Sequence, residues 1–489
     1  MSLFPSEGLT FDDVTLCTRY ADFLPEEAST ASLFSKNIQL KVPFVSAAMD
    51  TVTEHAMATS MAMEGGIGVI HKNLNPDKQA AEVRMVKGYL NGLINNPVTF
   101  GPKLTVDEIL QIKAEKNYIF TGFPIVDEES KLCGIFTAKD LKFISDTNVA
   151  VEEIMTKKLI SADVSCSVQE AHKIMIKERI GKLPLVDADG RLAGLYSFHD
   201  VSSLISGDDD SINRDDEYRL RVAAAIGPYD YERVEKLVNA GVDALVVDTA
   251  HGHSKGVLET VKELKKKYAI DIIAGNIATT EAAVALVKAG ADAIKVGIGP
   301  GSICTTRVVC GVGVPQLTAV YNVFKGTKGD VPIIADGGIK YSGDVPKALA
   351  VGANSTMMGS VLAGTKESPG EKILHHGRTY VVYRGMGSVE AMQSAQGSRE
   401  RYSHADVDDV SKLVPQGIEG LVELRGSVSH ILNQFVGGLR FSLGYCGART
   451  INELRKQAIF YRVSSAGLRE SHPHDVKIYK DAPNYSTGE

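Results

Sequence analysis

Short apolar runs recur along the chain, and each is followed by Gly, Asp, Asn or Ser. The runs are continuously apolar rather than alternating, which is typical of parallel strands that are covered on both faces. Eight such runs lie at residues 43–50, 66–72, 221–227, 243–252, 271–279, 292–302, 331–339 and 355–360. The pattern therefore predicts eight buried parallel strands.

Segments with helical spacing separate these runs. The clearest are residues 54–65, 230–241, 280–291, 315–324 and 344–353. Each ends on or near a glycine, a common helix stop. Eight strand-then-helix units in one chain favour a (β/α)8 barrel, an α/β fold. An open, doubly wound sheet is the alternative, and the count of eight favours the barrel.

Roughly 150 residues separate the second and third units, far more than one connection needs. This stretch holds an internal repeat, because residues 122–141 align with residues 182–201 at an offset of 60, so that Asp140 matches Asp200. We therefore expect a separate domain of two similar halves at residues 93–206.

The residues on either side of this insert, 1–92 and 207–489, are expected to form the barrel. Residues 375–430 are rich in Gly, Ser and charge, and they show no sustained helical or strand period. Barrel enzymes often need a lid, so we expect a mobile loop over the active face, with its active-site part at about 385–430. A disordered insertion is the alternative.

Composition narrows the class of protein. The 489 residues are 44% hydrophobic and 23% charged, as in ordinary soluble globular proteins. The six cysteines contain no CxxC pair, which excludes zinc-ribbon and thioredoxin-like sites. No apolar run approaches the roughly 18 residues of a membrane helix, and the first residues show no signal core. We expect a cytoplasmic protein with reduced thiols and no membrane partner.

Net charge changes the picture of possible ligands. A charge of −7 argues against a general nucleic-acid binder, which would usually be basic. It does not exclude a small anionic ligand, because backbone amides can hold a phosphate on an acidic protein. Gly337–Gly338 and Gly359–Ser360 follow the last two predicted strands, where barrels often bind phosphate.

The segment GIGPGSICTTR at residues 297–307 is the most informative part of the chain. It presents Cys304 at the carboxyl end of a predicted strand, close to Arg307. A thiol near a cation ionises more easily, which makes Cys304 a candidate nucleophile; a buried structural thiol is the alternative. Cys310 is the next candidate, and its apolar neighbours indicate a core residue instead.

Two carboxylates stand at the ends of other predicted strands. Asp248 and Asp336 could each accept both hydroxyls of a ribose, or could ligate a metal ion. The sequence contains no Asp/His cluster at ligand spacing, so the ribose interpretation is favoured.

Taken together, these motifs resemble those of IMP dehydrogenases, and the match covers nearly the whole chain. It includes LTFDDV (9–14), VSAAMDTVTE (45–54), GIGVIHKN (66–73), GSICTTR (301–307), DTAHGHS (248–254), AGNIAT (274–279), ADGGI (335–339), MMGSVLAGT (357–365), YRGMGS (383–388), RY (401–402), VPQGIEG (414–420) and ESHPHDV (470–476). The inserted repeat resembles a tandem CBS (Bateman) module. The resemblance implies the same (β/α)8 (TIM) barrel and a reaction of guanine nucleotide synthesis.

The resemblance assigns catalytic roles. Cys304 looks like the thiolate that adds to C2 of IMP, after which hydride passes to NAD and a covalent thioimidate remains. The loop then folds into the vacated nicotinamide site. Arg401 corresponds to the base that activates water, with Tyr402 beside it, and Thr306 helps to position that water.

The resemblance also assigns binding residues. Those implied for IMP are Ser46, Ser302, Asp336, Gly338, Gly359, Ser360, Tyr383, Gly385, Met386, Gly387 and Gln416, with Asp336 at the ribose and a cradle around Ser302 and Ser360 at the phosphate. Those implied for NAD are Asp248, Asn276, Gly297 and Gly299. A potassium site is implied at the carbonyls of Gly299, Gly301 and Cys304, completed by Glu470, Ser471 and His472 of a neighbouring subunit.

Regulation and assembly are implied as well. The family resemblance predicts purine nucleotides such as ATP or GTP at Thr137, Asp140, Ser197 and Asp200 of the insert, and a homotetramer or an octamer. The SFHD motif at 197–200 is a loose version of TAKD at 137–140. The residues after FDDV, Cys17–Thr18–Arg19, depart from the apolar-Pro run that is usual in the family.

Two rival functions remain. GMP reductase shares the cysteine loop but usually lacks the CBS insert and the RY pair, both of which are present here. A nucleotide-sensing protein on an inactive barrel is the other rival, and the intact Cys304, Thr306 and Arg401 argue against it.

Overall fold

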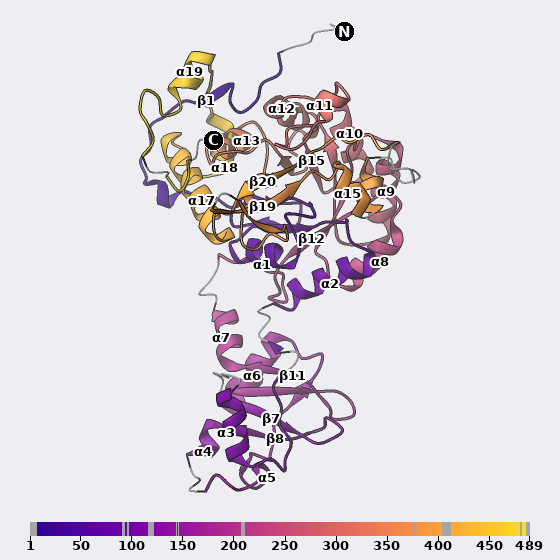
Figure 1. Cartoon of the computed structure of the whole chain (residues 1–489), viewed down its shortest axis with the longest axis vertical. Helices are drawn as coiled ribbons and strands as arrows, with labels where there is room; N and C mark the ends of the chain where they lie inside the picture. The colour runs from indigo at the N-terminus through magenta and orange to yellow at the C-terminus, as the bar shows by residue number, and fades with distance from the viewer. Residues whose placement is uncertain are drawn as a thin grey trace. The chain divides into compact units, whose positions relative to one another are not determined.

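The computed structural model describes residues 7–89, 93–94, 97–115, 122–142, 144, 146–206, 211–375, 377–394, 396–402, 412–479 and 482–485. The chain divides into two compact units (Figure 1). The first unit comprises Met1–Lys87, Ser211–Asn213 and Leu220–Glu489, and the second comprises Gly88–Asp210 and Arg214–Arg219.

Eight parallel strands of the first unit close into a barrel. Their order around it is β12 (Val222–Ile226), β13 (Ala244–Asp248), β14 (Asp271–Ile277), β15 (Ala293–Val296), β16 (Ile333–Asp336), β17 (Ser355–Met358), β4 (Phe44–Ser46) and β5 (Ile67–Ile70). Strand β5 pairs with β12 and so completes the circle. The predicted barrel is confirmed, and the open sheet is excluded.

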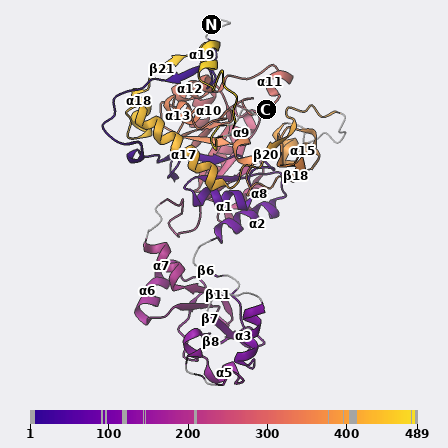
Figure 2. The same cartoon turned by 60° about the vertical axis from the view of Figure 1, so that its left-hand side comes forward.

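Helices cover the outside of the barrel. They are α1 (His55–Met63), α2 (Pro76–Lys87), α8 (Tyr231–Asn239), α9 (Lys255–Lys267), α10 (Thr280–Ala289), α12 (Gln316–Thr327), α13 (Asp344–Ala350) and α14 (Ser360–Ala363), followed by α17 (Val428–Tyr445) and α18 (Ile451–Gln457). Helices α1, α2 and α8 are neighbours (Figure 2). The Thr279 side chain caps the start of α10. Gly290 ends this helix in the left-handed conformation, and this glycine stop is the one that the sequence pattern predicts.

The barrel strands supply two apolar layers because successive side chains point to opposite faces. Ala223 and Ala225 of β12 belong to the cluster inside the barrel. Ala224 and Ile226 belong to the larger cluster between the strands and the helices. Both faces are therefore buried, which explains why the strand sequences are continuously apolar.

The segment at residues 375–430 differs in structure from the expected loop. It was expected to lack regular structure, but β18 (Lys372–His375), β19 (Arg378–Arg384) and β20 (Glu419–Glu423) form an antiparallel sheet, and α15 (Val389–Ser394) and α16 (Gln396–Arg401) lie between them. Val381 and Tyr383 of β19 are buried, whereas Val382 and Arg384, which alternate with them, are less so. The alternation of buried and less buried residues is short, and the charged residues around it make it hard to recognise in the sequence. Residues 403–411 lie outside the described residues.

Shorter elements complete the first unit: η1 (Pro25–Glu27), β1 (Val14–Leu16), β2 (Ser32–Leu33), β3 (Gln39–Leu40), α11 (Thr306–Val309), β21 (Phe460–Arg462) and α19 (Ser465–Glu470). Strand β1 pairs with β21 and so ties the two ends of the chain together. No helix among the residues described above is both long and apolar enough to span a membrane.

The second unit contains the repeat. Its elements are β6 (Leu93–Ile94), α3 (Val106–Glu115), β7 (Gly122–Val126), β8 (Leu132–Thr137), α4 (Ala138–Leu141), α5 (Val151–Ile154), β9 (Ala162–Asp163), α6 (Val168–Glu178), β10 (Lys182–Val186), β11 (Leu192–Ser197) and α7 (Phe198–Ser206). Hairpin β7–β8 lies 60 residues before hairpin β10–β11. Reciprocal backbone bonds join their turns, from Leu132 to Gly190 and from Leu192 to Ser130. The two hairpins thus occupy equivalent positions in the sequence repeat, and the assignment of residues 93–206 to a separate domain of two similar halves stays a prediction.

Candidate active site

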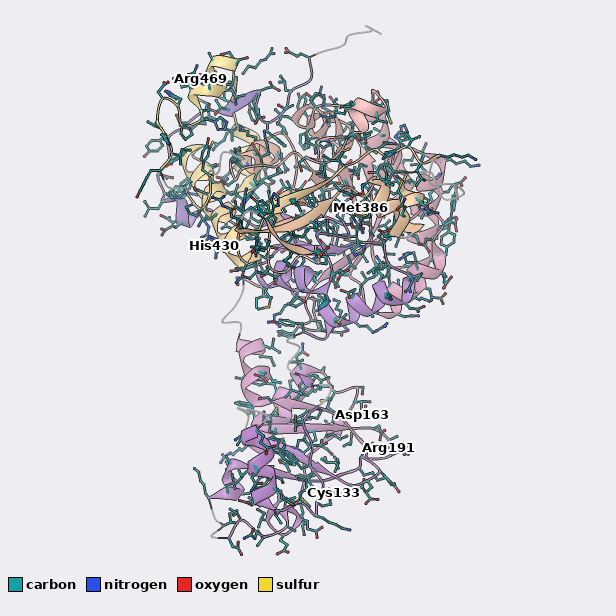
Figure 3. The ribbon with its side chains drawn as sticks, in the orientation of Figure 1. Cys133, Asp163, Arg191, Met386, His430 and Arg469 are labelled. Carbon is teal, nitrogen blue, oxygen red and sulfur yellow. The ribbon has the colours of Figure 1, made fainter. Side chains whose placement is uncertain are left out.

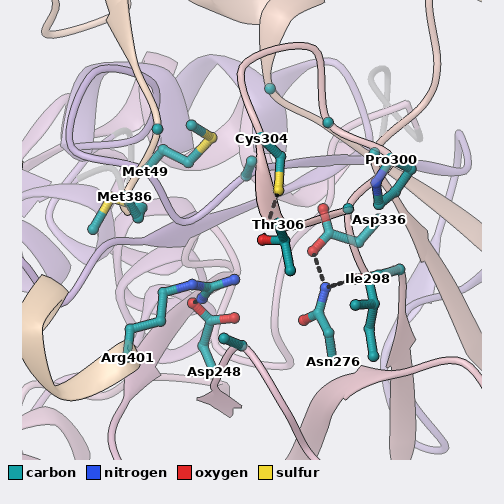
Figure 4. Close-up of a pocket in the computed structure, with 18 of the residues that line it drawn as sticks. Met49, Asp248, Asn276, Ile298, Pro300, Cys304, Thr306, Asp336, Met386 and Arg401 are labelled. Atoms are coloured by element: carbon teal, nitrogen blue, oxygen red, sulfur yellow. Dashed lines mark hydrogen bonds and ion pairs between the residues drawn. The ribbon is translucent and has the colours of Figure 1, made fainter. Parts of the chain in front are cut away.

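A cavity of about 140 Å³ lies at the carboxyl ends of the barrel strands (Figure 4). Residues at the ends of six different strands line it: Ala47, Asp248, Asn276, Gly297, Asp336 and Gly359. Functional groups of such barrels gather at this face because the strands are parallel and end together. Met386, which follows β19, closes another side of the cavity and is labelled in Figure 3.

The loop after β15 brings Cys304 to the cavity wall. The Cys304 amide donates to the carbonyl of Gly301, and the Cys304 Sγ lies 3.1 Å from the Thr306 hydroxyl. The loop is held from the other side by the Thr305 amide, which donates to the carbonyl of Gln416. Cys304 and Thr306, two of the residues with expected catalytic roles, therefore lie side by side.

Arg307 organises the loop rather than pairing with the thiol. Its guanidinium donates to the carbonyls of Ile298 at 3.0 Å and Val314 at 2.6 Å, and burial lowers its pKa. Gly299 has a φ of +79°, and a Cβ there would lie 2.6 Å from the Arg307 side chain. The loop thus wraps closely around Arg307, which explains why glycine is needed.

The expectation for Cys310 was wrong. It follows α11 and is exposed, although its apolar neighbours suggested a core residue. Val308, Val309 and Val312 beside it are exposed as well, so the apolar run is not part of the core.

A cluster of charges lies next to Cys304. The Lys295 Nζ lies 2.8 Å from Asp248 Oδ1 and 2.7 Å from Asp336 Oδ2. Asn276 Nδ2 donates to Asp336 Oδ2 at 2.9 Å and to the carbonyl of Gly297 at 2.7 Å. Asp248 Oδ2 forms an ion pair with Arg401 (Figure 4). Residues assigned to IMP, to NAD and to catalysis thus form one network.

Sequence reasoning missed Lys295. The only signal is its position, a lysine within the apolar run DAIKVGIG that forms β15. A charged residue in a strand that is buried on both faces needs a partner inside the barrel, and this one has two carboxylates.

Helix α16 delivers Arg401 to the cluster. The Ala250 amide donates to the carbonyl of Arg401 at 3.3 Å, and burial raises the pKa of the next residue, Tyr402. The Tyr402 ring lies against Gly387, where a Cβ would come within 2.7 Å of it. The RY pair is therefore seated on the barrel and faces Cys304 across the cavity.

A second cavity of about 210 Å³ adjoins the first and shares Pro300 with it. Ser302, Gly338 and Ser360, expected at a phosphate, all line it. The Tyr383 hydroxyl lies close to Gly359, because a Cβ at Gly359 would be 2.7 Å from it. Burial raises the pKa of Tyr383, and its hydrogen bond with Ser302 lowers it in part. The expected cradle residues are thus gathered in one place.

Ser46 does not reach either cavity. It is completely buried, and its hydroxyl accepts a hydrogen bond from Thr53 at 2.9 Å. Its neighbours Ala47, Ala48 and Met49 line the first cavity instead. A direct contact of the Ser46 side chain with a ligand is therefore not supported, because the strand alternation turns it into the interior.

A third cavity of about 380 Å³ lies on the other side of the cluster. Like the first, it is lined by Thr306, Arg401, Tyr402 and Gln416, and it extends along Thr249–His251. Gly385 and Gln416, two of the residues expected to contact IMP, line the first cavity. A third, Gly387, lies beside them, because its carbonyl accepts a hydrogen bond from the Gln416 amide. Three adjoining cavities thus run along the mouth of the barrel.

The residues expected at a potassium ion come from two places. Gly299, Gly301 and Cys304 share the cysteine loop, and Glu470 ends α19, followed by Ser471 and His472. The His472 Nδ1 lies 3.0 Å from the Tyr485 hydroxyl of the same chain. Across the described ranges, no three His, Cys, Asp or Glu side chains form a group that could hold a metal ion.

In the second unit, two of the expected nucleotide residues, Thr137 and Asp140, already bond to each other. Asp140 Oδ2 accepts from the Thr137 amide at 2.7 Å and from its hydroxyl at 2.8 Å, which forms a capping box at the start of α4. Ser197 ends β11 and is buried, and Asp200 lies in the first turn of α7. A cap is a local structural role, so these contacts do not by themselves indicate a ligand.

The fold and the site define an enzyme of the (β/α)8-barrel class with a cysteine loop at the barrel mouth. A family model described as the IMP dehydrogenase / GMP reductase domain matches residues 8–474. The chain belongs to this family.

Three relatives that are similar to the chain over nearly its whole length are members of the same family. Inosine-5'-monophosphate dehydrogenase of Aquifex aeolicus is 52% identical over 486 residues, which cover 98% of each chain. The proteins of the same name from Halalkalibacterium halodurans and Bacillus subtilis are 50% and 49% identical, with 99% of both chains covered.

The solved structures that match include a GMP reductase of Trypanosoma brucei in complex with guanosine 5'-monophosphate. It has a TM-score of 0.81 and 39% identity, and the match covers 96% of this chain and 98% of that one. Such coverage leaves no room for a large unmatched insert. The presence of the insert therefore does not distinguish an IMP dehydrogenase from a GMP reductase, and it does not count against GMP reductase here.

Proposed function

We propose that this protein is an IMP dehydrogenase, an NAD-dependent oxidoreductase that converts IMP to XMP. The observation that carries the proposal is the cavity in which Cys304 and Thr306 face Arg401 and Tyr402. Identity of about 50% to IMP dehydrogenases over nearly the whole chain supports it.

The chemistry has two steps. The Cys304 thiolate adds to C2 of IMP, and the hydride on C2 passes to NAD, which leaves a covalent thioimidate. Water then attacks C2, the bond to Sγ breaks, and XMP leaves. The Thr306 hydroxyl, 3.1 Å from Sγ, is close enough to hold that water, and Arg401 and Tyr402 on the opposite wall would activate it.

The substrate would lie across two cavities. The phosphate fits among Ser302, Gly338, Gly359, Ser360 and the Tyr383 hydroxyl, which together offer hydroxyl groups and close backbone approach. The ribose would bind Asp336, and the purine would lie near Gly385, Met386, Gly387 and Gln416.

NAD would supply the hydride acceptor, and its nicotinamide would enter from the third cavity, which shares Arg401 and Tyr402 with the first. Asp248, Asn276, Gly297 and Gly299 line the first cavity together with Cys304. Because Asp248 is paired with Arg401 in this structure, its carboxylate would be free for a ribose only when Arg401 withdraws. The described arrangement therefore corresponds to the docked RY pair, in which Arg401 would have to pass a proton to Asp248 before it could accept one from water.

A potassium ion fits the carbonyls of Gly299, Gly301 and Cys304, because backbone carbonyls are neutral oxygen ligands that suit a monovalent cation. The Gly301 carbonyl accepts only one hydrogen bond in the described network and keeps a second lone pair. Glu470, Ser471 and His472 of a neighbouring subunit would complete the site, which implies a homotetramer or larger assembly. Potassium would order the loop that carries the thiol.

The second unit would be a tandem CBS module that regulates the barrel. Its two equivalent halves support this proposal, with ATP or GTP expected near Thr137 and Asp140 and near Ser197 and Asp200. The nucleotide would compete with the capping contacts of Asp140.

The test is direct. Incubation with IMP and NAD should produce NADH, read by absorbance, and XMP, read by mass spectrometry. GMP reductase is the second candidate, favoured by the solved structures that match, and it would consume NADPH with GMP instead. No NADH in the first assay and turnover in the second would overturn the proposal.

A further inference from the structure

A lysine lies inside the barrel, where the apolar strand pattern predicts none. Lys295 is the third residue of β15; its neighbours Ile294 and Val296 are completely buried, and Lys295 itself is 1% exposed. Burying an ammonium group is costly unless it is paired and hydrogen-bonded. The groups around Lys295 therefore show what its charge does.

The Lys295 ammonium joins side chains from three other strands. It pairs with Asp248 of β13 and with Asp336 of β16, and it donates to Asn276 Oδ1 of β14. Asn276 also donates to the same oxygen of Asp336 that faces Lys295. One ammonium thus fixes the positions of both carboxylates at the floor of the cavity.

The charges of the cluster balance only when Arg401 is present. Asp248 offers Oδ1 to Lys295 and Oδ2 to Arg401, so two carboxylates face two cations. When Arg401 withdraws, one net negative charge remains. The oxidised nicotinamide ring carries one positive charge, and hydride transfer neutralises it. The cluster therefore suits oxidised NAD before hydride transfer and the Arg401 guanidinium after it.

We propose that Lys295 is a positioning residue that sets the net charge of this cluster. It neutralises one of the two carboxylates, so that the nicotinamide cation and the Arg401 guanidinium can neutralise the other one in turn. The inference rests on the proposed function and adds to it a reason for the order of the two steps. Without the Lys295 charge, the empty cluster would carry two negative charges, and one carboxylate would bind a proton at a higher pH.

Other titratable groups also face the cluster. Cys304 shares the cavity, and Tyr383 and Tyr402 interact electrostatically with it from β19 and from the end of α16. Burial raises the pKa of both tyrosines, so they stay neutral where carboxylates titrate. Because Cys304 shares the cavity with Lys295, alkylation of its thiol by iodoacetamide is followed against pH in every variant, and only a movement of the acid limb beyond that of the thiol reports on the carboxylates.

The test compares three variants of the full-length protein. Lys295→Gln keeps a hydrogen-bond donor and loses the charge, Lys295→Arg keeps the charge, and Lys288→Gln removes a lysine charge from the exposed face of α10 as a control. NADH formation from IMP and NAD is measured against pH as kcat/KM for NAD. We expect the acid limb to move up by about 1–3 pH units in Lys295→Gln alone.

Several outcomes would overturn the inference. An acid limb that stays in place in Lys295→Gln, with activity lowered equally at every pH, would indicate a purely structural role. Thermal unfolding of each variant checks the fold. If Lys295→Gln does not fold, Lys295→Arg decides, because a moved limb despite the retained charge contradicts the proposal. If the unaltered protein forms no NADH, the proposed function fails, whereas an active protein with an unmoved Lys295→Gln profile refutes only this inference.

Discussion

Replacing Gly397 by alanine is expected to lift α16 off the barrel and to slow hydrolysis selectively. Gly397 lies in α16, four residues before Arg401, and it packs directly on the backbone that follows β5. A Cβ there would overlap the Lys72 carbonyl oxygen, and it would lie 2.9 Å from the Lys72 carbonyl carbon and 3.3 Å from Asn73 Cα. Backbone atoms cannot turn aside as a flexible side chain can.

The size of the effect follows from this contact. Overpacking of this kind costs about 1–3 kcal/mol. At about 1.4 kcal/mol per factor of ten, the ratio of docked to undocked α16 falls roughly 5- to 150-fold. The Ser398 amide, which donates to Asn73 Oδ1 at 3.1 Å, would be drawn away with the helix. Alanine favours helix formation over glycine, so the helix itself should persist.

The assay separates the two chemical steps. Rapid mixing with IMP and NAD should still give the first burst of NADH, because Cys304 is untouched, and intact-protein mass spectrometry should show the adduct accumulating. Gly437→Ala in α17 is the matched control, since no atom lies within 4 Å of a Cβ there, and it should leave turnover unchanged. Loss of the burst, or normal turnover without adduct in Gly397→Ala, would refute the reasoning.

Four further outcomes are expected. Cys304→Ala should abolish NADH formation while IMP still binds in calorimetry, whereas the exposed Cys310 should tolerate alanine; appreciable turnover of Cys304→Ala would contradict the nucleophile. Arg401→Ala should give one burst of NADH and a persistent adduct, and a missing burst would exclude a purely hydrolytic role. Potassium should activate more than sodium, and only in the oligomer, as gel filtration and assays at several dilutions would show. Excising residues 93–206 with a short linker should retain NADH formation and abolish any response to ATP or GTP; an inactive but folded barrel would rule out a purely regulatory insert.

The barrel could be predicted because its signal is local. Each strand is a short apolar run that ends in a polar or glycine residue, as in DALVVDTAHG, and this pattern records burial on both faces. The repeat was equally visible, because two hairpins with the same turn chemistry recur at a fixed offset. Asp127 and Asp187 cap the two turns in the same way, each accepting a backbone amide at 2.8 Å.

The segment at 375–430 shows why other parts were missed. Strand β19 is stabilised by pairing with β18 and β20, and β20 lies about 40 residues along the chain. Its alternation covers only a few residues and is flanked by arginines, so it is weak when read alone. Long-range pairing supplied the stability that local pattern did not reveal.

The sequence by itself determined the eight strands, the position of the insert and the candidate residues Cys304, Asp336 and Arg401, because these follow from local patterns and motifs. Only the tertiary structure decided which of them meet. It turned Ser46 into the interior, engaged Arg307 with backbone carbonyls, and joined Asp248 to Arg401 through an ion pair. It also disclosed Lys295 as the centre of the cluster. The physical reason is that closing the barrel brings strand ends from distant parts of the chain together, and the cost of burying a charge then depends on partners that no local window contains.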